Sequence, residues 1–158
     1  MANRSVVVER RIAAPAERVW RALTDLERAP AVLSAVESVE LLSEGAFGVG
    51  TRWRETRRML GKRATEEMWV TASEPPLGYV VEAASRGARY VSDFALRPAG
   101  PAATDVRMTF TAVPPGGAAG LAARLLGGLG ARAVARAIAK DLEDVAASVE
   151  REGPPGGG

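Results

Sequence analysis

The residues available for chemistry are few in kind, because the chain contains neither histidine nor cysteine. The absence of cysteine excludes disulfides and thiolate nucleophiles, and the absence of histidine removes the commonest general base and metal ligand. Any catalysis would therefore use aspartate, glutamate, tyrosine, arginine or a bound water. We expect no cofactor and no metal site, and the sequence assigns no catalytic residue.

The densest group of charged side chains lies in RWRETRRMLGKRATEEMW, residues 52–69. Glu55, Arg57 and Glu66 in this segment could orient the polar head of a ligand, or serve as acid, base and enolate stabiliser. They could equally form a cross-strand ion pair that is half exposed to water. The choice between these roles depends on which side of the fold the three side chains face.

The charge of the chain gives no indication of a nucleic-acid partner. The formal net charge is only +2, and 47% hydrophobic with 25% charged residues is typical of a globular domain. Glutamates lie within and opposite the basic run from Arg52 to Arg63, which favours a solvated, paired hairpin over a nucleic-acid groove.

No apolar run is long enough for stable membrane insertion, and residues 1–8 lack the apolar core of a signal peptide, so a cytoplasmic location is predicted.

The elements that must position these side chains are read from the apolar pattern. A β-branched run predicts a strand at 5–13, and Pro15 with the apolar spacing after it predicts an amphipathic helix. Pro30 interrupts this helix, so a second short helical turn precedes the strand that begins at Val36. Turns rich in glycine then divide the chain, as far as VPPGG, into alternating segments typical of an antiparallel meander.

An Ala- and Leu-rich segment at 118–151 predicts one long helix. Its apolar stripe consists of Leu121, Leu125, Leu129, Val134, Ile138, Leu142, Val145 and Val149. The glycines of LLGGLGARA each cost about 1 kcal/mol relative to alanine inside a helix, which suggests a kink. The kink would either make the first helical segment a mobile cover over a cavity mouth or allow close packing on the sheet.

Several segments carry a resemblance to a known family: IAAPAERVWRALTDLERAP, EEMWVTASEPP and FALRPAGPAATDVRMTF. The chain resembles the START-like or SRPBCC superfamily over nearly its whole length, and more narrowly the bacterial polyketide cyclase/dehydrase and lipid-transport branch. The resemblance implies an α+β helix-grip fold like that of the birch-pollen allergen: a strand, two short helices, a six-stranded antiparallel meander and a long C-terminal helix over the curved sheet. It also implies a cavity between that helix and the sheet. Residues 1–152 would be a single ligand-binding domain, and residues 153–158 a flexible tail.

The turn at Gly61 and Lys62 predicts which side chains face that cavity. A two-residue loop there would pair Leu60 with Arg63 and fix the register of both strands. The pairs on one face would be Arg57 with Glu66, Glu55 with Met68, and Trp53 with Val70. On the other face, Arg54 would lie opposite Trp69 as a cation–π pair. The first face holds the more buryable residues, so we assign it to the cavity wall.

Alternation in the later strands adds aromatic and sulfur-containing side chains to the same wall. The predicted ligand-binding residues are therefore Trp53, Glu55, Arg57, Glu66, Met68, Tyr79, Tyr90, Phe94, Met108, Phe110, Leu125 and Leu129. Their aromatic and methionine members could also be ordinary core residues, because core and cavity wall overlap in such a fold.

The resemblance implies a ligand-binding cavity but does not identify the ligand or the function. The leading hypothesis is a protein that binds or carries a hydrophobic or amphipathic small molecule, such as a lipid, an isoprenoid or a polyketide-like compound. In such a carrier, Arg57 would anchor an acidic or carbonyl head group. The first alternative is a cyclase or dehydratase in which Glu55 or Glu66 acts as acid or base with a tyrosine, and Arg57 stabilises an enolate. The second is a co-chaperone-type interaction module that uses its outer surface.

Overall fold

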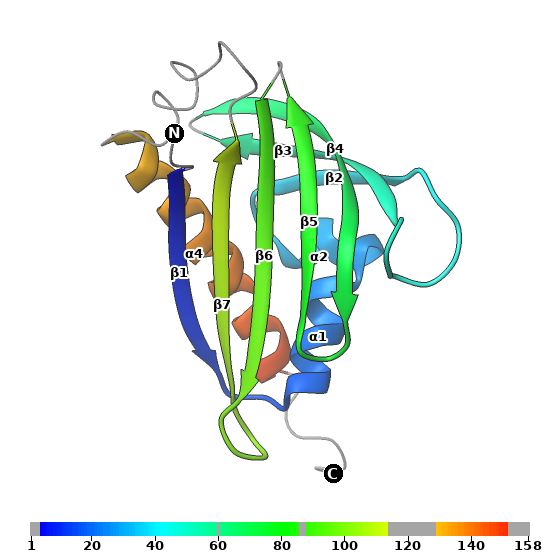
Figure 1. The fold of residues 1–158 in the computed structure, drawn as a ribbon. Helices are drawn as coiled ribbons and strands as arrows, with labels where there is room; N and C mark the ends of the chain where they lie inside the picture. Colours follow the sequence, from blue (N-terminus) through cyan, green and yellow to red (C-terminus); the bar gives the residue numbers. More distant parts are fainter. Residues whose placement is uncertain (1–3, 60, 86–87, 114–128, 152–158) are drawn as a thin grey trace.

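Figure 1 shows an antiparallel sheet that curves around a long C-terminal helix, with short helices at one end of that helix. The structure, a computed structural model, describes residues 4–59, 61–85, 88–113 and 129–151. The predicted tail at 153–158 lies outside the described residues, as do Leu121, Leu125 and the first two glycines of LLGGLGARA.

The elements follow the predicted order, which confirms the α+β helix-grip arrangement. They are β1 (Arg4–Ile12), α1 (Ala16–Thr24), η1 (Leu26–Arg28), α2 (Ala29–Val32), β2 (Val36–Leu41), β3 (Arg52–Met59), β4 (Lys62–Glu74), β5 (Gly78–Ser85), β6 (Ala88–Pro98), β7 (Thr104–Val113) and α4 (Leu129–Arg151). The strands form one seven-stranded sheet in the order β1-β7-β6-β5-β4-β3-β2, with every neighbouring pair antiparallel. Strands β2 to β7 are therefore the predicted meander, and β1 closes onto β7.

The core lies between the sheet and α4. The apolar stripe of α4 is buried as predicted over the described helix, from Val134 to Val149. It packs in one cluster with Ile12 of β1, Val19 of α1 and Val106 of β7, all of them fully buried. Leu129 is the first residue of α4, and the structure describes its backbone without its side chain.

The short helices are fixed to α4 by polar contacts as well as by packing. Arg18 of α1 donates a hydrogen bond from Nη2 to the backbone oxygen of Val149 at 2.6 Å. Just after α2, the backbone N and the hydroxyl of Ser34 both donate to Oδ2 of Asp144, at 2.9 and 2.8 Å. Pro30 lies in the first turn of α2, where its missing N–H costs no hydrogen bond. These contacts place α1, η1 and α2 along one wall of the interior.

The predicted register of the β3–β4 hairpin is wrong by two residues. Met59 pairs with Lys62, so β4 begins at Lys62, which the prediction placed in the loop. The reason is the backbone of Gly61, whose φ of +75° is the left-handed conformation that such a loop requires and that lysine resists. The observed pairs are Arg57 with Ala64, Glu55 with Glu66, and Trp53 with Met68.

A slip of two residues leaves every side chain on its predicted face, because side chains alternate with a period of two. The cation–π contact on the outer face does change partner. The guanidinium of Arg52 lies 5.2 Å from the centre of the Trp69 ring, whereas Arg54 forms an ion pair with Glu40. The prediction that Arg54 covers Trp69 is therefore wrong, and the register explains why.

Truncation of the buried core should lower stability much more than truncation on the outer face of the same strand. We expect Ile12→Ala to reduce the free energy of unfolding by about 2–5 kcal/mol, because Ile12 is fully buried and its removal leaves a cavity. Val7→Ala, at a residue that is 53% exposed, should change it by less than about 0.5 kcal/mol. Urea unfolding measures both, and equal losses would contradict the described packing of β1.

Candidate functional site

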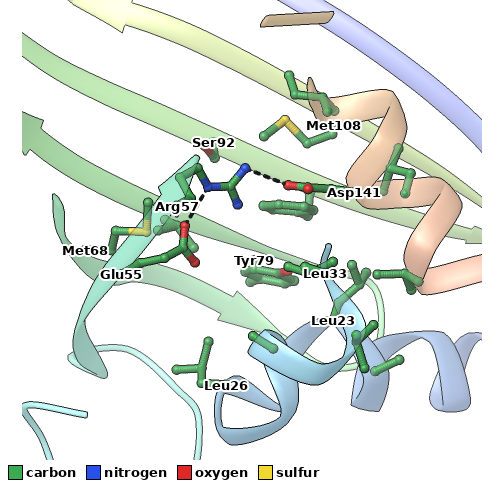
Figure 2. A pocket seen from close by; sticks show the side chains of 18 of the residues that line it. Leu23, Leu26, Leu33, Glu55, Arg57, Met68, Tyr79, Ser92, Met108 and Asp141 are labelled. Atoms are coloured by element: carbon green, nitrogen blue, oxygen red, sulfur yellow. Dashed lines mark hydrogen bonds and ion pairs between the residues drawn. The ribbon is translucent and has the colours of Figure 1, made fainter. Parts of the chain in front are cut away.

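A pocket of about 200 Å³ lies between the concave face of the sheet, the short helices and α4 (Figure 2). Strands β3 to β7 contribute Trp53, Glu55, Arg57, Met68, Tyr79, Val81, Ser92, Phe94, Met108 and Phe110. The short helices and the residues beside them contribute Ala22, Leu23, Asp25, Leu26, Ala29, Val32 and Leu33, and Phe47 comes from the β2–β3 connection. Helix α4 contributes Val134, Ala137, Ile138, Asp141, Leu142 and Val145. The wall is mostly apolar, with a few polar groups among these side chains.

One part of the wall is aromatic. Tyr79 of β5 stacks on Phe94 of β6 with ring centres 4.5 Å apart. Trp20 of α1 and Phe47 meet Tyr79 edge-on, at 5.4 and 5.2 Å. Edge-to-face and stacked pairs of this kind add about 0.5–1.5 kcal/mol each beyond the area that they bury. Phe47, Tyr79 and Phe94 therefore form a rigid aromatic surface on this side of the pocket, and Trp20 packs against it.

The polar part of the wall is an ion-pair cluster centred on Arg57 (Figure 2). The Nε of Arg57 donates to Oε2 of Glu55 at 3.0 Å, and its Nη1 donates to Oδ2 of Asp141 at 3.1 Å. Glu55 and Arg57 belong to β3, and Asp141 belongs to α4, so the guanidinium connects the sheet to the helix. The Arg57 side chain is only 19% exposed, which strengthens both interactions relative to a surface ion pair.

Burial and mutual charge shift the protonation of this cluster. Burial lowers the pKa of Arg57, but the charges and hydrogen bonds of Asp141 and Glu55 outweigh it, so the net pKa lies above its ordinary value. Burial raises the pKa of Asp141; Arg57 opposes that shift, and the charge of Glu55 adds to it. Burial and then the charge of Glu55 raise the pKa of Glu66. Burial raises the pKa of Tyr79 above its usual range, so its phenol stays protonated at neutral pH.

Two buried polar atoms in the pocket wall have no hydrogen-bond partner among the described residues. They are Oδ1 of Asp141, an acceptor, and Nε1 of Trp53, a donor. Trp53 is only 4% exposed, so its indole N–H is withdrawn from bulk water. An unpaired buried polar atom costs about 1–3 kcal/mol, which a molecule in the pocket could recover by pairing with it.

The structure places eight of the twelve predicted residues on the pocket wall. They are Trp53, Glu55, Arg57, Met68, Tyr79, Phe94, Met108 and Phe110. The described wall does not include Glu66, which lies across the β3–β4 ladder from Glu55, or Tyr90, which stacks on Phe110 at 5.5 Å within the core. Leu125 lies outside the described residues, and the side chain of Leu129 is not described.

The predicted trio of Glu55, Arg57 and Glu66 needs one correction. In the structure Arg57 binds Glu55 and Asp141, whereas Glu66 faces Glu55. The sequence did contain a signal for Asp141, because it lies three residues after Ile138 and four before Val145, on the apolar face of the helix. A carboxylate at that position must either find a partner in the interior or face a cavity.

Within the part of the chain that the structure describes, no group of three or more acidic, histidine or cysteine side chains could hold a metal ion. None of the described helices is both long and apolar enough to span a membrane.

Replacement of Arg57 should destabilise the protein most at neutral pH. Arg57→Met leaves Glu55 and Asp141 without their shared cation, and we expect a loss of about 3–5 kcal/mol in the free energy of unfolding near neutral pH. Arg57 opposes the burial that raises the pKa of Asp141, so removal of Arg57 raises that folded-state pKa further. The protonated carboxyl group then favours the folded variant at acid pH, and this contribution is lost as the pH rises through the folded-state pKa. The loss should therefore shrink at about pH 5.

Denaturant unfolding at the two pH values measures this effect. Arg58→Met is the matched control, because Arg58 is the next residue of β3, its side chain is 64% exposed, and its partner Glu37 lies on the outer face. Arg58→Met should lower the free energy of unfolding by no more than about 1 kcal/mol at either pH. A loss from Arg57→Met that is small, or independent of pH, would contradict the described cluster.

Comparisons with known proteins agree with this architecture. A family model described as polyketide cyclase/dehydrase and lipid transport matches residues 3–150. The protein TTHA0849 from Thermus thermophilus is similar at 25% identity and a TM-score of 0.77, over 95% of this chain and 99% of that one. No curated protein matches this chain in the sequence comparison.

Two further solved structures, at lower identity, show likeness of fold alone. The Zhui aromatase/cyclase from Streptomyces sp. R1128 has 21% identity and a TM-score of 0.81, over 99% of both chains. A START superfamily protein from Mycobacterium smegmatis has 13% identity and a TM-score of 0.76, over 95% of this chain and 99% of that one. With the family match over residues 3–150, the chain belongs to the polyketide cyclase/dehydrase and lipid-transport family.

Proposed function

We propose that this protein binds and carries a hydrophobic or amphipathic small molecule, such as a lipid, an isoprenoid or a polyketide-like compound, in the pocket between the sheet and α4. The observation that carries the proposal is the composition of the wall, in which mostly apolar side chains from sheet and helices surround the ion-pair cluster of Glu55, Arg57 and Asp141. This is the composition of small-molecule sites in general, where apolar surface supplies affinity and a few polar groups fix orientation. The proposal includes the cytoplasmic location predicted from the sequence.

The wall gives such a ligand two different surroundings. The aromatic side chains of Phe47, Tyr79 and Phe94, with Trp20 packed against them, would hold an apolar body, and each methylene withdrawn from water would add about 0.8 kcal/mol. The cluster around Arg57 would meet the polar head (Figure 2). Under this proposal, the predicted residues on the pocket wall contact the ligand. Glu66 does not contact the ligand, and its negative charge affects the head group indirectly, through the neighbouring Glu55.

Filling the pocket should abolish binding and leave the fold intact. Ala137 of α4 lines the pocket, and Ala139, two residues further along, is exposed. We expect Ala137→Phe to place its ring in the pocket and to lower the affinity for an environment-sensitive naphthalene dye at least tenfold, whereas Ala139→Phe should leave it unchanged. Fluorescence titration of both variants is the measurement, with circular dichroism to verify folding. Equal affinities in the two variants would contradict binding in this pocket.

Native mass spectrometry of freshly expressed protein tests the carrier proposal directly. A retained mass of lipid size that is present in the Ala139→Phe variant and absent from the Ala137→Phe variant is the expected result. Extraction and fragmentation of that mass would identify the ligand.

A second candidate function is a cyclase or dehydratase reaction, favoured by the raised pKa of Asp141 beside Arg57. In the dehydration of a β-hydroxy ketone, a carboxylate removes the proton from the carbon next to the carbonyl, and the guanidinium stabilises the enolate oxygen. The enolate then expels the hydroxyl group, which takes up a proton and leaves as water, and a carbon–carbon double bond forms. Asp141 would supply the carboxylate in this reaction, in place of Glu66.

Asp141→Asn separates the two functions. For an enzyme of this kind it should lower turnover of a β-hydroxy ketone at least a hundredfold, with little change in the affinity for the naphthalene dye. Stopped assays of dehydration by chromatography, in parallel with dye titration, measure the two effects. Absence of any conversion by the wild-type protein leaves the carrier as the proposed function.

A further inference from the structure

Negative charge is in excess at the polar end of the pocket. Arg57 is the only cationic side chain on the described pocket wall, and it is already paired with both Glu55 and Asp141. Glu66 adds a third carboxyl group behind Glu55, across the β3–β4 ladder. A ligand head that enters this region therefore meets two carboxylates on the wall and a guanidinium whose Nε and Nη1 are both engaged.

Asp141 also has an acceptor atom that points to the chemistry of that head. Its Oδ2 accepts the hydrogen bond from Arg57, and its buried Oδ1 has no partner among the described residues. A buried carboxylate oxygen can be satisfied only by a donor, either a hydroxyl or an N–H group. On the same wall, the N–H of Trp53 is the reverse case, a buried donor that requires an acceptor.

We propose that the ligand of this pocket is a neutral or cationic molecule that donates a hydrogen bond from a hydroxyl or ammonium group to Asp141, and that carboxylate ligands such as fatty acids are excluded. The proposal rests on the proposed binding function and names the ligand class. A ligand oxygen along the apolar body would in addition accept the N–H of Trp53. Phenols, alcohols and amines on an aromatic or alicyclic framework fit these requirements.

Exclusion of carboxylates follows from the charges already present. A carboxylate head would offer no donor to Oδ1 of Asp141 and would be repelled by Glu55 and Asp141 in a region of low dielectric. Bound at Nη2 of Arg57, it would lie beside the two carboxylates that already neutralise this guanidinium. This reverses the sequence-based expectation that Arg57 anchors an acidic head group.

A matched set of naphthalenes tests the head group alone. The four probes are 2-naphthol, 2-(aminomethyl)naphthalene, 2-methoxynaphthalene and 2-naphthoate, which share one apolar body and differ in donor and charge. At neutral pH we expect the naphthol and the amine to bind at least about tenfold more tightly than the methoxy compound, because they satisfy Asp141. Naphthoate should bind most weakly. Isothermal titration calorimetry is the measurement.

Asp141→Asn then assigns the effect to this residue. We expect the advantage of the amine over the methoxy compound to fall below about threefold and the affinity for naphthoate to rise. Glu143→Gln is the matched control, because it removes one negative charge from an exposed position of the same helix, and it should leave the order unchanged. If the Asn variant does not fold, the wild-type series still decides the question.

The outcomes separate this inference from the proposed function. Binding of all four probes with equal affinity, or tighter binding of naphthoate than of naphthol, overturns the inference and leaves the pocket as a binding site. An order that is unchanged in Asp141→Asn also overturns it. Absence of binding by every probe to the folded protein overturns the inference and the proposed function together.

Discussion

One guanidinium connects the two layers of this protein inside their shared interior. Arg57 reaches from β3 to Asp141 of α4 and is held in place by Glu55 on its own strand. Charged groups in an apolar interior are tolerated only when paired and hydrogen-bonded, so the three side chains depend on one another. Most of the remaining wall is apolar, with Asp25 and Ser92 as exceptions, and the cluster therefore gives the pocket a polar end for any molecule that enters it.

Much of the fold follows from local features of the sequence. Pro15 and Pro30 mark the first turns of the short helices, and the period of the apolar residues from Val134 to Val149 predicts which face of α4 is buried. Side-chain alternation likewise predicts the inner face of β3 and β4. These features depend on residues close together in the chain, which is why sequence patterns contain them.

The details of the candidate site depend on contacts between distant residues, and the sequence predicted these less well. The hairpin register depends on which position of the loop has a positive φ. In the structure Gly61 has a positive φ and directly precedes the first paired residue of β4, Lys62. Strand pairing is the only tertiary geometry that the turn signals of the sequence specify, so the sequence predicts partners for Arg57 on β3 and β4 alone. Besides Glu55, Arg57 pairs with Asp141, which is 84 residues away on a helix whose rotation and height over the sheet result from the packing of the whole core.

The contacts of the short helices with α4 have a mechanical consequence. Arg18 holds α1 to the end of α4, and Ser34 holds the segment after α2 to Asp144, so the helices form one unit that faces the sheet. The hydrogen bond between Arg57 and Asp141 joins this unit to β3 at the pocket wall. The polar end of the pocket therefore lies where the helical layer meets the sheet, and its geometry depends on how α4 packs on the core.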